Sequence, residues 1–146
     1  MKYSFQSART KAIVSLRTKP AEMTILMTGR PKILIVEDES DVRRLYAIGL
    51  NQRGFEVKLA ANGAEAVDRI AHEKPDVILL DWLMPLMDGE EVLKKLSGNG
   101  NGPVSVIVIS GQQPPETVDP RIRCWLTKPV SIEELVTEIE RPAAVR

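Results

Sequence analysis

Five polar side chains in this sequence follow closely on runs of apolar residues, and their types suit phosphate chemistry. They are three acids, a hydroxyl and an amine: Glu37, Asp38, Asp81, Ser110 and Lys128. Three carboxylates placed together would raise each other's pKa unless a cation lay between them. Oxygen ligands favour a hard ion, and Mg²⁺ typically binds one or two carboxylates, several waters and a phosphate oxygen. If the fold brings these residues together, we expect a magnesium site.

The same set also suits a covalent phosphoryl group. A carboxylate is a competent nucleophile and forms an acyl phosphate in aspartyl-phosphate enzymes. Three ionised acids give the site a charge of −3, which one amine and one Mg²⁺ return to zero. Phosphoryl transfer depends mostly on positioning and charge neutralisation, and the metal, the amine and the hydroxyl supply both. The residue types therefore indicate phosphoryl transfer at a carboxylate.

Alternating strand and helix patterns begin at Lys32 and determine where these side chains fall. Apolar or alternating runs predict five strands, at Lys32–Val36, Phe55–Leu59, Val77–Leu80, Val104–Ile109 and Trp125–Thr127. Helices are expected between them, the first opening at a Ser40 cap with Val42, Leu45 and Tyr46 on its inner face, and the last capped by Ser131.

Repeated strand–helix units predict an α/β fold with a parallel sheet and helices on both faces. Ligands of such sheets bind beyond the carboxyl ends of the strands, where the strand order reverses. All five polar residues are expected at that edge. Between the fourth and fifth strands, the prolines of residues 111–121 leave room for at most a short turn of helix, between Pro115 and Pro120.

Composition places limits on the class of protein. The 146 residues, 43% hydrophobic and 27% charged, are typical of one globular domain, and no apolar stretch approaches the length of a membrane span. The single cysteine, Cys124, favours a reducing cytoplasm and argues against a zinc site. Residues 1–32 hold seven bases and one acid, whereas residues 33–146 hold 13 bases and 19 acids. We therefore expect no nucleic-acid binding by the folded domain.

Four segments together resemble the receiver domain of two-component response regulators. They are Ile33–Glu39, Asp81–Pro85 with Asp88–Gly89, Val108–Gly111 and Leu126–Pro129. The resemblance covers roughly residues 32–140. It implies a flavodoxin-like, doubly wound sheet of five parallel strands in the order 2-1-3-4-5, here with a short or irregular fourth helix.

The resemblance also implies a metal site and a phosphoacceptor. Asp81 would accept a phosphoryl group from a histidine of a partner kinase or phosphotransfer protein. Asp38 and Asp81 would bind Mg²⁺ directly, with the Leu83 backbone carbonyl as a third ligand and Glu37 acting through water. The implied protein is a signalling switch that catalyses only its own phosphorylation and dephosphorylation.

Three further residues take roles from the resemblance. Lys128 would contact the phosphoryl group, Ser110 would move onto it, and Trp125 would be the switch aromatic, although a plain core role for Trp125 stays open. Leu83 and Gln112 occupy positions that tune dephosphorylation in this family. Because an apolar Leu83 cannot orient a water molecule, we expect slow dephosphorylation.

The expected organisation has three parts: a basic extension at 1–31 that is disordered or an over-extended start, a receiver domain at 32–141 and a tail at 142–146. The chain ends directly after the last helix, so a stand-alone, cytoplasmic receiver of the chemotaxis-regulator type is expected. The sequence leaves dimerisation, the kinase and the downstream target open.

Two rival functions are weighed against this one. A phosphorylation-independent interaction module would have no need of all five polar residues. A Mg²⁺-dependent phosphatase of the haloacid-dehalogenase type would need a second Asp where Leu83 stands.

Overall fold

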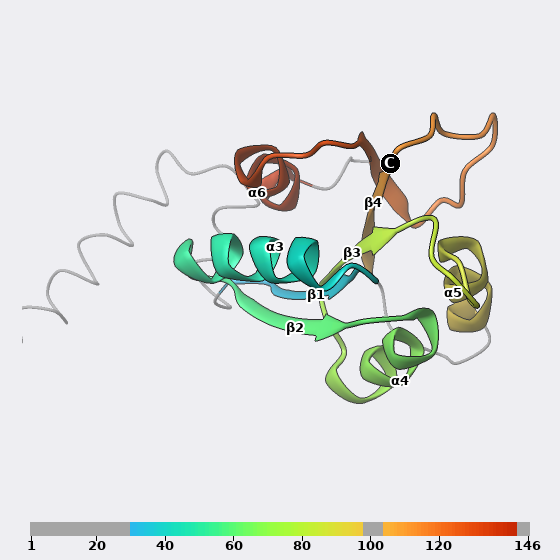
Figure 1. Ribbon diagram of the computed structural model, residues 1–146, viewed down its shortest axis with the longest axis horizontal. Coiled ribbons are helices and arrows are strands. Elements are labelled where there is room, and N and C mark those ends of the chain that lie inside the picture. The colour runs from blue at the N-terminus through green and yellow to red at the C-terminus, as the bar shows by residue number, and fades with distance from the viewer. Residues whose placement is uncertain (1–29, 98–103, 143–146) are drawn as a thin grey trace, which may run out of the picture. The chain divides into compact units, whose positions relative to one another are not determined.

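The computed structural model describes residues 30–97 and 104–142 (Figure 1). Residues Pro31–Ile139 form one compact unit; the second unit is described only by its edges, where Arg30 pairs with Glu140 at 2.8 Å. The basic extension before Arg30 and the Gly-Asn segment at 98–103 lie outside the described residues. In chain order the elements are β1 (Lys32–Val36), α3 (Ser40–Gln52), β2 (Glu56–Ala60), α4 (Gly63–Glu73), β3 (Val77–Asp81), α5 (Gly89–Ser97), β4 (Ser105–Ser110), β5 (Ile122–Thr127) and α6 (Ile132–Glu140).

The five strands form one sheet in the order β2-β1-β3-β4-β5, and every neighbouring pair is parallel. This confirms the predicted flavodoxin-like topology. The three central strands are aliphatic at nearly every position and almost fully buried, which is typical of strands covered on both faces. β5 lies at an edge and is only half-buried.

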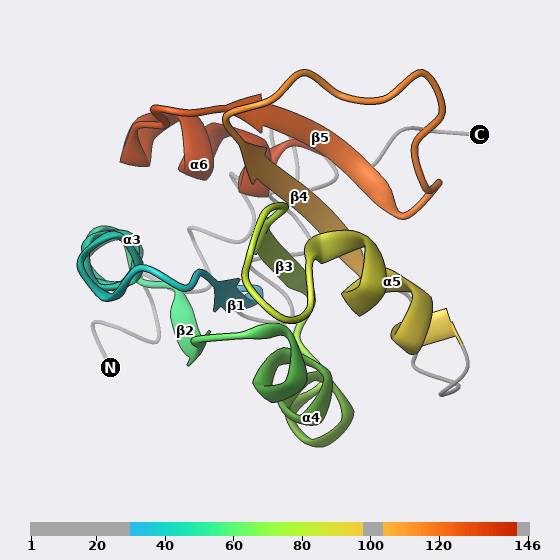
Figure 2. The same cartoon turned by 45° about the vertical axis from the view of Figure 1, so that its right-hand side comes forward.

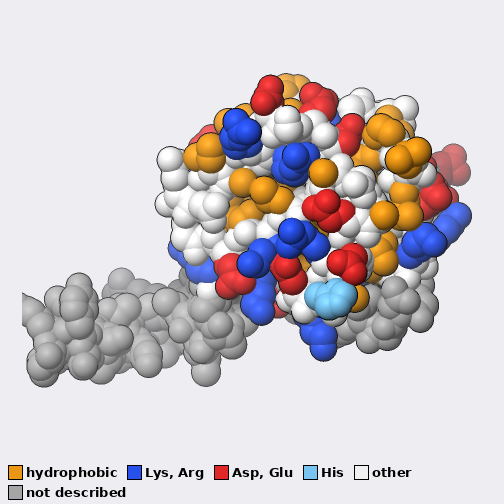
Figure 3. Space-filling view, turned by 60° about the horizontal axis from the view of Figure 1, so that its bottom comes forward, with side chains coloured by type: hydrophobic (Ala, Val, Ile, Leu, Met, Phe, Trp, Pro, Cys, Tyr) orange, Lys and Arg blue, Asp and Glu red, His pale blue; other side chains and the backbone are white. Residues whose placement is uncertain are grey.

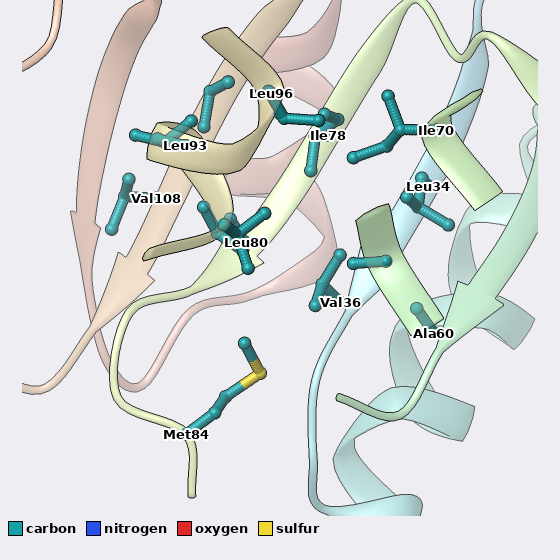
Figure 4. Close-up of a cluster of buried hydrophobic side chains, with 13 residues drawn as sticks. Leu34, Val36, Ala60, Ile70, Ile78, Leu80, Met84, Leu93, Leu96 and Val108 are labelled. Atoms are coloured by element: carbon teal, nitrogen blue, oxygen red, sulfur yellow. The ribbon is translucent and has the colours of Figure 1, made fainter. Parts of the chain in front are cut away.

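Helices cover both faces of the sheet (Figure 2). On one face, α3 and α6 contribute Leu50 and Leu135 to a buried cluster with Ile35 and Leu79. On the other face, α4 and α5 pack against the side chains that point the opposite way. Figure 4 shows this second core, with Leu34, Val36, Ile78, Leu80 and Val108 from the strands and Ile70, Leu93 and Leu96 from the helices.

The connection from β4 to β5, residues 111–121, contains no helix (Figure 2). At most a short turn of helix was expected between Pro115 and Pro120, and the structure has no helical turn there. Gly111 to Val118 are all exposed. A helix is thus missing from the face that α4 and α5 cover, next to the edge strand β5.

Two predictions about the first helix are wrong. Ser40 is not its cap but its first residue, and the preceding Glu39 makes no side-chain capping bond. Leu45 is 60% exposed, because the inner face of the helix carries Tyr46, Ala47 and Leu50. The last helix does begin at a Ser131 cap, whose hydroxyl accepts a hydrogen bond from the Glu134 N–H.

Candidate functional site

Strand register brings the predicted polar residues to one edge of the sheet. Val36 pairs with Leu80, so Glu37 lies level with Asp81 on the neighbouring strand. Asp81 pairs with Ile109, which places Ser110 one residue further along β4. Ser110 pairs in turn with Thr127, the last residue of β5, and the N–H of Lys128 donates to the Ser110 carbonyl at 2.8 Å.

Three carboxylates meet at this edge. One oxygen each from Glu37, Asp38 and Asp81 lies within 4.8 Å of the other two. Glu37 and Asp81 are almost fully buried, whereas Asp38 is exposed and opens the cluster to solvent. The Glu39 N–H donates to Glu37 Oε2 at 3.1 Å and fixes that side chain. The cluster is a buried acidic pocket with one open side.

The Lys128 amine lies 3.5 Å from Glu37 Oε1 and 3.6 Å from Asp81 Oδ1. Burial and then the charge of Glu37 raise the pKa of Asp81 from 3.8 to about 7, and Lys128 opposes part of this rise. Burial alone would lower the pKa of Lys128, but the charges of Asp81 and Glu37 outweigh it and raise that pKa. One amine therefore does not compensate the buried acids fully.

The site suits a hard divalent cation. Glu37 Oε1 is buried and accepts no hydrogen bond, although buried carboxylate oxygens normally have a partner. With Asp38 and Asp81 it forms an all-oxygen donor set, which suits Mg²⁺ and not a metal that prefers nitrogen or sulfur. A cation would coordinate this oxygen, which has only the Lys128 amine at 3.5 Å, and would relieve the repulsion that raises the pKa of Asp81.

Two residues near the cluster were missed by sequence reasoning. The guanidinium of Arg43 donates to the Glu37 carbonyl at 2.7 Å and, more weakly, to the Asp38 carbonyl at 3.4 Å, which holds the acidic loop against α3. Tyr46 is buried, and burial followed by the charge of Glu37 raises its pKa. The sequence did not predict that Arg43 binds the backbone of the acidic loop, or that Tyr46 lies close enough to Glu37 for its pKa to respond. An arginine in a helix is usually solvated, and a buried tyrosine is usually only part of the core.

Ser110 and Trp125 are connected through the backbone of Gln112. The Gln112 N–H donates to Ser110 Oγ at 3.0 Å, and the Trp125 indole N–H donates to the Gln112 carbonyl at 2.9 Å. The Trp125 ring also packs against Trp82, with centroids 5.1 Å apart and planes tilted by 59°. Trp125 thus lies beside Trp82 and is linked to Ser110 through a single residue, Gln112, a connection that spacing along the sequence did not reveal.

The loop after Asp81 has two exposed leucines. Leu83 is 53% exposed, so its side chain lies outside the core, and its backbone role stays a prediction. Leu86 is fully exposed and has a positive φ of 72°, which is unusual for a residue with a branched side chain. Gly89 closes the loop by donating its N–H to the Trp82 carbonyl at 2.9 Å.

Two surface observations bear on partners. Among the described residues, no helix is long and apolar enough to cross a membrane. On the face in Figure 3, the described acidic and basic side chains are interspersed and form no broad patch of one sign.

Comparison with known proteins identifies the family. Residues 33–140 match the response regulator receiver domain. The response regulator MprA of Mycobacterium tuberculosis is 35% identical over 111 residues, which are 74% of this chain and 48% of MprA. This chain thus spans about half the length of the curated relatives it matches.

Solved structures of receiver domains also resemble this chain. The receiver domain of the Francisella response regulator 1452 is 30% identical with a TM-score of 0.67, covering 75% of this chain and 93% of that one. The chemotaxis protein CheY4 of Vibrio cholerae is 27% identical with a TM-score of 0.66, covering 76% and 97%. Together with the sheet order and the family match, these likenesses show that the chain belongs to the response regulator receiver family.

Proposed function

We propose that this receiver accepts a phosphoryl group on Asp81 in a Mg²⁺-dependent reaction and thereby switches its interactions with other proteins. The observation that carries the proposal is the buried Asp81 carboxylate, which lies 3.6 Å from the Lys128 amine and within a cluster of three acids. Receiver domains bind Mg²⁺ at an acidic pocket and act as phosphorylation-dependent switches. The cluster described above supports the same role here.

The proposed transfer needs little from the protein beyond position and charge. A carboxylate oxygen of Asp81 bonds to phosphorus as the bond from phosphorus to the donor's histidine nitrogen breaks. The departing imidazole keeps that electron pair and takes a proton from solvent. Bound at Glu37, Asp38 and Asp81, Mg²⁺ would supply positive charge against the phosphoryl oxygens. Lys128, 3.6 Å from Asp81, would neutralise part of the added charge.

The proposed donor is a sensor histidine kinase or a histidine phosphotransfer protein. α3 begins three residues after Glu37 and exposes Leu45 and Ile48, which are 60% and 49% exposed. Exposed leucine and isoleucine on a helix beside the acceptor site would let a partner helix pack against it. This surface supports a helical partner that brings its histidine to the open side of the acidic pocket.

Ser110 is the proposed first element of the switch. If its hydroxyl turns towards the phosphoryl group, the Gln112 N–H loses its acceptor and the Gln112 carbonyl can shift. The Trp125 indole is bonded to that carbonyl, so the change would reach Trp125 next. A bistable pair of arrangements at Trp125 would present two different surfaces to a target protein.

The decisive experiment is intact mass after incubation with Mg²⁺ and acetyl phosphate. One phosphoryl group should appear on the wild type, and none on Asp81→Asn or with EDTA present. Asp68→Asn is the matched control, because Asp68 is exposed on α4 and, among the described residues, pairs only with His72. Labelling of Asp81→Asn at the wild-type level would overturn the proposal.

The two rival functions predict different results. The interaction module would show neither labelling nor metal binding. A phosphatase would hydrolyse small phosphate esters such as p-nitrophenyl phosphate with repeated turnover, whereas the proposed switch releases at most the phosphoryl group it carries. Leu83 in place of a second Asp favours the switch.

The predicted organisation remains part of the proposal. Residues 32–141 would be the receiver, flanked by the basic extension at 1–31 and the tail at 142–146. An immunoblot of fractionated native cells would report the size of the protein and test the stand-alone, cytoplasmic arrangement, and cross-linking before and after labelling would test dimerisation.

A further inference from the structure

A pocket of about 290 Å³ lies between α5 and the helix-free connection of residues 111–121, beside the edge strand β5. Its apolar walls are Trp82, Leu93, Pro115, Val118, Ile122 and Trp125. The two indoles pack against each other at 5.1 Å and form one side of it. The pocket exists because residues 111–121 form no helix that would cover this part of the sheet.

The size and charge of the pocket restrict its occupant. Its volume is at the lower end of ligand pockets, which hold about 300–1,000 Å³, so it suits one large side chain better than an extended cofactor. The charged residues around it are paired: Glu90 with Lys94 at 3.3 Å, and Asp119 with Arg121 at 2.7 Å. Because acids and bases at the rim neutralise each other, the pocket favours an uncharged ring.

The rim of the pocket also favours a polypeptide over a free small molecule. Within the described part of the chain, the backbone N–H and C=O groups of Glu116, Thr117 and Val118 make no hydrogen bond. All three residues are exposed, and Thr117 and Val118 line the pocket. A peptide laid beside them can exchange main-chain hydrogen bonds while a side chain enters the pocket.

We propose that this pocket binds an extended segment of a partner protein through one uncharged aromatic side chain, seated against Trp82 and Trp125. Aromatic rings in a pocket with a polar rim are the usual anchors of protein interfaces. The Trp125 N–H is held by the Gln112 carbonyl, and the Gln112 N–H by Ser110 Oγ. Resting on the proposed function, phosphorylation at Asp81 changes the affinity of the pocket through these two hydrogen bonds.

The test uses the full chain labelled with ¹⁵N and the peptide acetyl-Ala-Phe-Ala-amide. The chain has two tryptophans, so the spectrum contains two indole N–H signals. Both should shift in a saturable way, and acetyl-Ala-Ala-Ala-amide should shift neither. Val118→Glu should weaken peptide binding about tenfold by adding an unpaired charge at the rim. Gln52→Glu, which adds the same charge at an exposed position of α3 across the sheet, is the control and should bind as the wild type does.

Three outcomes would overturn the binding proposal. They are the absence of shifts, equal binding by the Phe and Ala peptides, and equal affinity for p-cresol, which offers a ring without a backbone.

The coupling between Asp81 and the pocket is measured separately, by titrating the peptide into protein whose labelling with acetyl phosphate has been verified by mass. A change of about threefold or more in affinity, absent from Asp81→Asn, supports coupling. Unchanged affinity in labelled protein refutes the coupling alone, whereas a failure to label refutes the proposed function alone.

Discussion

At the residue scale, the molecule places an acid where it is costly to ionise. Asp81 is 4% exposed and lies against a second buried carboxylate, and within the described part of the chain only the Lys128 amine pairs with both. The chemistry of this group was predictable from its position at the end of an apolar strand. The repulsion from Glu37 was expected as well, but burial, which is the largest cause of the raised pKa of Asp81, was not.

The stability of the metal-free protein should therefore depend on the charge of Asp81. Its folded pKa of about 7 is above the ordinary value of 3.8. The folded protein then holds a proton that the unfolded chain releases, so the free energy of unfolding falls as pH rises from about 4 to about 7. Asp81→Asn should melt at a higher temperature than the wild type in EDTA at pH 8, and at a similar temperature at pH 4.5. A difference of equal size at both pH values would contradict this explanation.

Leu83 should set the lifetime of the phosphoryl group. Its exposed, apolar side chain offers no hydrogen bond to an attacking water. Leu83→Asn should shorten the lifetime by about tenfold, less than the roughly 10²–10⁴-fold of a side chain that transfers the proton itself, because Asn would only orient the water. The measurement is the decay of the phosphorylated mass after removal of acetyl phosphate. Leu86→Asn, in the same loop and fully exposed, should decay at the wild-type rate, and an unchanged lifetime in Leu83→Asn would disprove the role.

At the element scale, strands were easier to predict than helix faces. The central strands are runs of aliphatic residues buried on both sides, a signal with few alternative explanations. The first helix carries apolar residues on more than one face, so its sequence does not reveal that Leu45 and Ile48 are exposed. The prolines did predict the loss of a helix before β5, but not the tryptophan-lined pocket that this loss creates.

The loop between β3 and α5 stores strain that one substitution should release. Leu86 has a positive φ, and its fully exposed side chain makes no packing contribution. Leu86→Gly should raise the free energy of unfolding by about 1 kcal/mol, the lower end of the cost of this conformation for a residue with a Cβ. Urea denaturation would measure the change. Leu83→Gly is the control: Leu83 has no positive φ, so glycine there should lower stability.

At the scale of the whole molecule, Mg²⁺ should stabilise the fold by binding only the folded state. Asp81 ends β3, whereas Glu37 and Asp38 follow β1, so only folding brings the three acids together. At a Mg²⁺ concentration one hundred times the dissociation constant, the free energy of unfolding should rise by about 2.7 kcal/mol. Thermal melts with and without Mg²⁺ would show the gain, which Asp38→Asn should reduce and Asp68→Asn should retain. An equal gain in both variants would place the ion elsewhere.

The paired tryptophans also give this molecule an optical signature of its own. Two indoles whose centres are 5.1 Å apart have transition dipoles that interact, so their absorption bands split and produce a circular dichroism couplet. The sequence has no third tryptophan to obscure it. Any event that turns the ring of Trp125 relative to Trp82 changes the sign or size of that couplet. Switching in this receiver should therefore be visible in the unlabelled protein, in real time, by ultraviolet spectroscopy.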